Sequence, residues 1–141
     1  MSGKLDRAIA EAEKESQSQE LAAEVYVRQR RALDEQITTL WEKFRAAIET
    51  ECNVRKGHLR FGVCVTTEAI VERIDDRKHT TMRVRLLRES SLIAFACNGA
   101  SGFCTFKLNE RNIAVICDQD GYPYASIADA ADEVLSLLFT L

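Results

Sequence analysis

The sequence predicts an α+β fold with a long N-terminal helix, an antiparallel meander of five or six strands, and a C-terminal helix packed on the sheet. Three observations predict it. Residues 4–51 contain neither glycine nor proline. Residues 59–117 then alternate apolar and polar side chains in short runs separated by turn formers. Residues 127–141 return to the helical spacing of apolar side chains.

The N-terminal segment is composed of good helix formers. Residues 4–51 are rich in Ala, Glu, Gln, Lys, Arg and Leu, so intrinsic propensity favours a helix throughout. Residues 13–20, EKESQSQE, carry no apolar side chain, which predicts either a solvated helical arm or a break between two helices. We expect residues 1–20 to form a weakly anchored helical arm and residues 21–141 a single α+β domain. Whether the helix continues through residues 1–20 is left open.

The meander is predicted from runs of period two. The alternation is clearest where Met82, Val84 and Leu86 point inward between arginines. The run EAIVERID suits a strand or a short helix, and a strand is favoured because DDRKHT then makes a polar turn. Residues 98–102, NGASG, are expected to be a loop because they hold two glycines. The expected strands are residues 59–66, 68–75, 81–88, 92–98, 103–109 and 113–117.

The C-terminal helix is expected to begin at Ser126, a good capping residue, with Asp129 placed as in a capping box. Its apolar stripe should pack on the sheet. The stripe consists of Ile127, Ala131, Val134, Leu138 and Leu141. The core expected from all elements consists of Leu33, Ile37, Leu40, Phe44, Phe61, Val63, Val84, Leu86, Phe95, Phe106, Val115, Val134 and Leu138.

The cysteines indicate a reducing compartment. Their number is odd, and most of them lie in apolar runs, which is typical of buried free thiols. No stretch approaches the roughly 20 apolar residues of a membrane-spanning helix, and the N-terminus lacks the apolar core of a secretory signal. We therefore expect a cytoplasmic protein. The five cysteines are Cys52, Cys64, Cys97, Cys104 and Cys117.

The sequence contains none of the metal-binding, catalytic or phosphate-binding motifs considered below. The cysteine spacings contain no CxxC and the histidines no HxxxH, so no metal site is predicted. His58 and His79 are expected to be solvated loop residues without a nucleophile to activate. The segment from Gly99 to Gly102 lacks the lysine of a phosphate-binding loop. We predict no catalytic residues, no cofactor and no enzymatic activity.

Basic side chains cluster in the middle of the chain. Residues 51–90 carry nine basic and six acidic side chains, although the whole chain has a net charge of −3. The pattern predicts a solvated sheet face with cross-strand salt bridges, or a face for an acidic protein or for nucleic acid. Aromatic side chains for base stacking are missing from residues 72–88. The candidate face for an anionic partner consists of Arg60, Arg73, Arg83, Arg85 and Lys107.

The apolar seam of the N-terminal helix predicts self-association, because one sheet and one short helix are too little to cover it. The expected function is a non-enzymatic protein–protein interaction module, adaptor or chaperone-like, that forms a homodimer and binds a protein partner. The alternative is a nucleic-acid-associated protein that uses the basic face of residues 55–88. A small enzyme is the third hypothesis. The candidate self-association residues are Tyr26, Leu33, Ile37, Leu40, Trp41 and Phe44.

Overall fold

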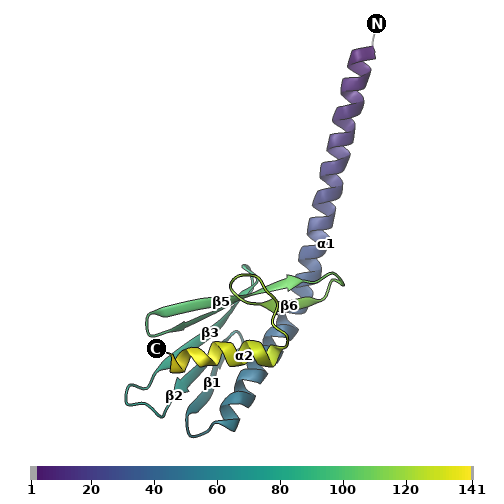
Figure 1. Cartoon of the computed structure of the whole chain (residues 1–141). Helices are drawn as coiled ribbons and strands as arrows, with labels where there is room; N and C mark the ends of the chain where they lie inside the picture. The colour runs from purple at the N-terminus through teal and green to yellow at the C-terminus, as the bar shows by residue number, and fades with distance from the viewer. Residues whose placement is uncertain (1–2, 141) are drawn as a thin grey trace. The chain divides into compact units, whose positions relative to one another are not determined.

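The computed structural model of the protein describes residues 3–140, apart from the side chain of Cys64. It confirms the α+β layout, with one long helix, six antiparallel strands and a C-terminal helix (Figure 1). The stretch up to Ala32 and the residues from Leu33 onward form two separate units. The elements are α1 (Gly3–Val54), β1 (Leu59–Val65), β2 (Glu68–Arg73), β3 (Thr81–Leu87), β4 (Leu92–Cys97), β5 (Ala100–Leu108), β6 (Ala114–Cys117), α2 (Ile127–Ser136) and the 3₁₀ helix η1 (Leu137–Phe139).

The first unit is the N-terminal stretch of α1. Residues 13–20 are helical, so of the two alternatives the polar stretch is a helical arm and not a break. Glu, Gln and Lys lose little side-chain freedom in a helix, which explains why a run without apolar residues still adopts one. Every residue from Gly3 to Gln29 is exposed, so nothing within this unit buries its apolar side chains.

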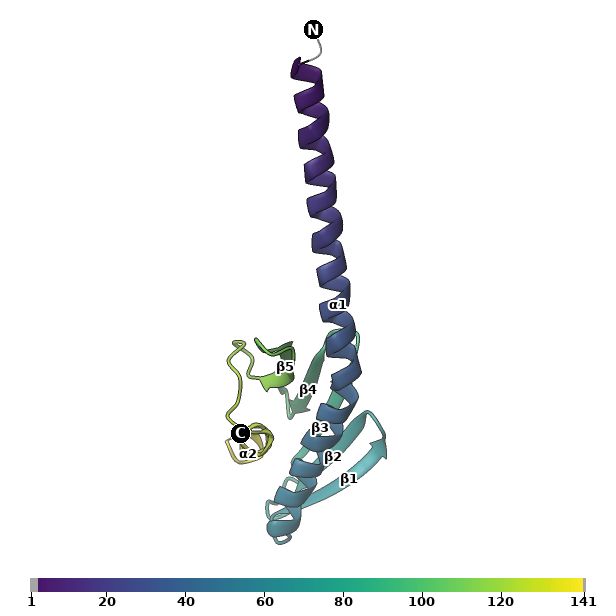
Figure 2. The same ribbon diagram turned by 90° about the vertical axis from the view of Figure 1, so that its right-hand side faces the viewer.

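The second unit is the sheet with its covering helices. The strands follow one another in the order β1-β2-β3-β4-β5-β6, each antiparallel to the next, as the short predicted turns require. The sheet is curled, and the C-terminal half of α1 and α2 lie on the same side of it (Figure 2). We call this side the inner face and the opposite side the outer face.

The register places the apolar side chains of neighbouring strands together on the inner face. Val71 of β2 pairs with Phe61 of β1 and with Met82 of β3, while Phe106 of β5 pairs with Ile116 of β6. Paired residues of an antiparallel sheet share a face, so each pair adds to one continuous apolar surface. β2 is a strand, as favoured from the sequence.

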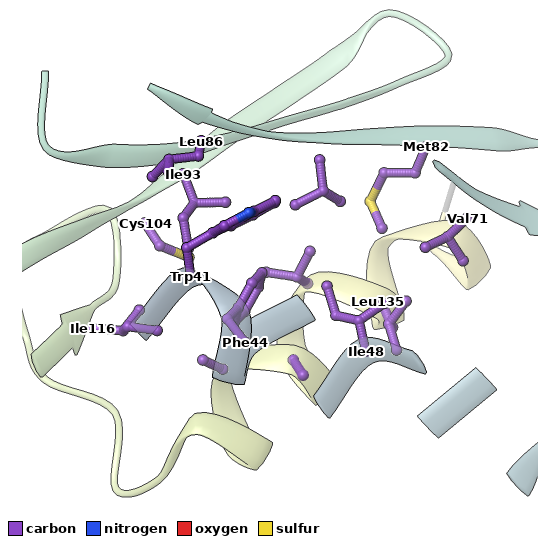
Figure 3. Packing of buried hydrophobic residues seen from close by; sticks show 14 of the residues in the cluster. Trp41, Phe44, Ile48, Val71, Met82, Leu86, Ile93, Cys104, Ile116 and Leu135 are labelled. Atoms are coloured by element: carbon purple, nitrogen blue, oxygen red, sulfur yellow. The ribbon is translucent and has the colours of Figure 1, made fainter. Parts of the chain in front are cut away.

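The core lies between the inner face, α1 and α2. Trp41, Phe44 and Ile48 of α1 point into it and are buried there (Figure 3). The indole Nε1 of Trp41 donates a hydrogen bond to the carbonyl oxygen of Thr66, at 2.7 Å. A buried indole N–H needs such a partner, and this one fixes α1 to the turn between β1 and β2.

Most of the expected core residues contribute to the core, and two do not. Val63 lies on the inner face opposite Ala69, but 52% of it is exposed, because β1 is an edge strand and its pairing with β2 is irregular between Val63 and Val65. Val115 is half-buried on the outer face, whereas its neighbour Ile116 is buried. The expected residues found buried are Ile37, Phe44, Val84, Leu86, Phe106, Val134 and Leu138, and Leu33, Leu40, Phe61 and Phe95 pack against them half-buried.

The turn between β4 and β5 is shorter than expected. Asn98 and Gly99 both have positive φ, at 45° and 84°, and they make a two-residue turn, the type that best matches the twist of a hairpin. β5 therefore begins at Ala100, and the prediction of a loop as far as residue 102 is wrong. Gly102 lies within the strand, where a Cβ atom would come within 2.6 Å of the Phe95 ring.

The C-terminal helix begins as expected. The Ser126 side chain accepts a hydrogen bond from the Asp129 backbone N–H, at 3.1 Å. Four of the five residues of the predicted stripe lie within the described part of the chain, and Leu141 falls outside it. The 3₁₀ helix η1 then ends the described chain. Between Gly3 and Thr140, no helix is both long and apolar enough to span a membrane.

Candidate functional site

The exposed apolar side chains of the first unit form the most unusual surface of the protein. Leu21 is 62% exposed and Tyr26 is 68% exposed. In the segment Leu21–Val27, LAAEVYV, only Glu24 is charged. Scattered apolar side chains are normal on a protein surface, and a group as dense as this one is a candidate interaction site. We call the following set the α1 apolar surface: Leu5, Ile9, Leu21, Val25, Tyr26 and Val27.

The candidate self-association residues are divided between this surface and the core. Tyr26 belongs to the α1 apolar surface, whereas Leu33 and Leu40 are half-buried against the core of the second unit. Ile37, Trp41 and Phe44 are buried inside that core, so a partner cannot contact their side chains. The spacing of the seam did not distinguish the two parts, because the same periodicity serves an intrachain core and a contact between chains.

Four of the five candidate residues for an anionic partner lie on the outer face. Arg60, Arg83, Arg85 and Lys107 each alternate with buried inner-face neighbours. Arg60 pairs with Glu72, at 3.5 Å, across β1 and β2. Arg83 pairs with Glu68, at 3.2 Å, across β2 and β3. These cross-strand ion pairs offset part of the positive charge of the face.

Arg73 does not join the other four. It pairs in register with the buried Leu59, which places it on the inner side. Its guanidinium lies 4.3 Å from the centre of the Phe139 ring and donates to the carbonyl oxygen of Leu138, at 3.2 Å. Arg73 therefore lies on the opposite side of the sheet from Arg83 and Arg85, contrary to the expected common face, and it holds η1 against the end of β2.

A polar network surrounds Arg73 at the start of β1 and the end of β2. His58 Nδ1 contacts an Asp75 carboxylate oxygen, and Arg73 Nε donates to the other, at 2.6 Å. The hydrogen bond from His58, followed by that from Arg73, holds the pKa of the Asp75 carboxyl below its ordinary value. This pair could not be predicted from the sequence, because 17 residues separate His58 and Asp75 and only the strand register brings them together.

The network continues to Asp76. Its carboxylate accepts a hydrogen bond from the Thr80 hydroxyl, at 2.7 Å, and this bond lowers the pKa of the Asp76 carboxyl. The arrangement closes the turn between β2 and β3. Together, the contacts of His58 and Arg73 with Asp75 tie the start of β1 to the end of β2.

A cleft of about 240 Å³ lies between β4, β5, the loop after β6 and α2. Its lining includes the aromatic residues Phe95, Phe103 and Tyr124 and the acidic residues Asp118 and Glu133. Tyr124 is hydrogen-bonded to Glu133, and burial raises the pKa of its hydroxyl well above the ordinary value. A phenol that stays protonated acts as a hydrogen-bond donor and not as a base.

The cysteines give no reactive or metal-binding centre among the described side chains. Cys52, Cys97, Cys104 and Cys117 are free and buried, while the side chain of Cys64 lies outside the described part. Burial raises the pKa of the Cys104 thiol to about 11, and that of Cys52 also to about 11, so these thiols are poor nucleophiles. Within residues 3–140, no group of three His, Cys, Asp or Glu side chains is arranged to hold a metal ion.

Comparison of the chain with protein-family models, with curated proteins and with solved structures finds no match.

Proposed function

We propose that the protein is a non-enzymatic protein–protein interaction module, adaptor or chaperone-like, that self-associates through α1. The observation that carries the proposal is the exposure of the α1 apolar surface from Leu5 to Val27. Apolar side chains of this size gain roughly 1.5–3 kcal/mol each when they are fully buried. Nothing within the first unit supplies that burial, and a partner helix would.

The repeat along α1 supports a helical partner. Counted in sevens, Leu5, Ala12, Tyr26, Leu33 and Leu40 fall on one line, which only the polar Gln19 interrupts. Such a line is one of the two apolar positions in each seven residues of helices that pack along one another. The second position is occupied by Ile9, Ala23 and Ile37 but is interrupted by Ser16 and Arg30. A polar residue within such a line is a known means of fixing the register between two helices, at a cost in stability.

The outer face of the sheet supports a second contact, with another protein. On this face the half-buried Ile70 pairs with the exposed Arg83, and the half-buried Phe103 lies across Ala94 from the exposed Arg85. Such a mixture of apolar and charged side chains resembles the composition of a non-obligate interface. Nucleic-acid binding by residues 55–88 is the alternative. It is less well supported, because Glu68 and Glu72 already pair with Arg83 and Arg60.

Tyr26→Asp tests the proposal. We expect the wild-type chain to elute as an oligomer at micromolar concentration, and this variant to shift towards the monomer in size-exclusion chromatography with light scattering. Gln17→Asp introduces the same charge on the same helix outside the apolar segment and should keep the wild-type mass. A wild-type monomer at high concentration, or equal behaviour of the two variants, contradicts the proposal.

Random-sequence DNA distinguishes the alternative. Binding through phosphate contacts weakens steeply as salt is raised. We expect no salt-sensitive DNA binding from the wild-type chain, and a Kd that rises with salt and depends on Arg85 would favour the nucleic-acid hypothesis.

A further inference from the structure

Leu21–Val27 is apolar around most of the helix and not along one stripe. Successive residues of an α-helix are about 100° apart. Leu21 and Val25 therefore face one direction, Ala22 and Tyr26 a second, and Ala23 and Val27 a third. The remaining direction is occupied by Glu24, and all of these residues are exposed.

A helix that is apolar on nearly all sides is normally surrounded by other elements. A single partner helix covers one direction and would leave exposed either Leu21 with Val25 or Ala23 with Val27. Covering both pairs requires more than one neighbouring helix. The α1 apolar surface is thus too wide for the expected homodimer.

The charges on the remaining strip indicate what the neighbours are. The strip centred on Glu24 carries Glu13 and Glu20 before it and Arg28, Arg31 and Glu35 after it. A parallel copy of α1 would set Glu20 beside Glu20 and Arg28 beside Arg28. An antiparallel copy centred on the same apolar segment sets Glu20 beside Arg28, which is the favourable arrangement next to that segment.

We propose that Leu21–Val27 is the centre of an antiparallel bundle of α1 helices from more than two copies of this chain. The inference rests on the proposed self-association and specifies its partner and order. Each helix contributes apolar side chains to at least two neighbours, and its charged strip lies at the margin of the bundle, where Glu20 of one helix lies beside Arg28 of a neighbour.

Two variants on opposite sides of the helix test the number of neighbours. The wild-type chain should show a mass above twice the 15.9 kDa of one chain. Leu21→Asp with Val25→Asp, and separately Ala23→Asp with Val27→Asp, should each abolish that species. If only one of the two variants lowers the mass, or if the wild type is a dimer, the bundle is wrong and the self-association stands. A wild-type monomer overturns both.

Charge reversal tests the direction of the helices. Glu20→Arg places a positive charge beside Arg28 of a neighbour in an antiparallel bundle, and we expect the apparent Kd of association to rise by tenfold or more. Adding Arg28→Glu to the same chain restores opposite charges and should restore the wild-type Kd. In a parallel bundle, Glu20→Arg only replaces a contact between two glutamates by a contact between two arginines. An unchanged Kd for Glu20→Arg, or a failure of the double variant to recover, overturns the antiparallel arrangement.

Discussion

At the scale of single residues, two buried threonine hydroxyls differ in whether they have a hydrogen-bond partner. The Thr80 side chain donates to Asp76, at 2.7 Å, in a residue that is 5% exposed. Thr105 Oγ1 is also buried, yet it has no hydrogen-bond partner among the described residues. A buried polar group without a partner loses its hydration and gains nothing in return.

Replacing each threonine by valine should therefore have opposite effects. Thr80→Val removes a hydrogen bond to a carboxylate and should lower the free energy of unfolding by about 1–3 kcal/mol. Thr105→Val removes an unpaired hydroxyl while keeping nearly the same volume, and should leave that free energy unchanged or raise it by up to about 1 kcal/mol. Urea titration of both variants measures the two effects. A loss of more than about 1 kcal/mol for Thr105→Val would show that its hydroxyl is bonded.

At the scale of elements, burial depends on where a strand lies in the sheet. Phe106 of β5, an interior strand, is buried in the core, whereas Val63 of the edge strand β1 is half exposed on the same inner face. Phe106→Ala should lower the free energy of unfolding by about 3–5 kcal/mol, and Val63→Ala by less than about 1 kcal/mol. Denaturant unfolding of the two variants at equal protein concentration provides the comparison. If the two variants lose similar amounts of unfolding free energy, the Val63 side chain is buried in solution, and its assignment as exposed is wrong.

The elements themselves could be predicted from the sequence, because their signals are local. The absence of glycine and proline, the period-two runs and the Ser126 cap each act within a few residues, and they correctly place α1, the six strands and α2. The sheet face on which a side chain lies is harder to predict where the alternation of apolar and polar residues is weak. In β6, AVIC has no alternation to choose between Val115 and Ile116, and in β2 the small Ala69 gave no sign that it lies inward.

The candidate site could be predicted only in part. Tyr26 could be predicted because it continues the apolar seam of α1. The wider apolar surface around it could not, because helical periodicity does not show which apolar side chains are exposed. The contact of His58 with Asp75, and the inward position of Arg73, depend on the register between β1 and β2. Register is a property of the paired strands, and neither strand specifies it alone.

At the scale of the whole molecule, the two units should respond differently to dilution. Most helical stability in proteins comes from packing of an apolar face. From Gly3 to Gln29, α1 has no such packing within the chain, whereas Trp41 of the second unit is buried in an intrachain core. If the α1 helices enclose one another, dissociation removes the support of the first unit and leaves the core of the second intact.

Circular dichroism over a dilution series therefore separates the two units. Ellipticity at 222 nm should weaken as the oligomer dissociates, because the N-terminal stretch of α1 frays. The fluorescence maximum of Trp41, the single tryptophan of the chain, should stay unchanged over the same range, since its burial does not depend on a partner. Tyr26→Asp should show the weak ellipticity at every concentration. If fluorescence and ellipticity instead change together, the second unit unfolds on dissociation, and its core is not self-sufficient.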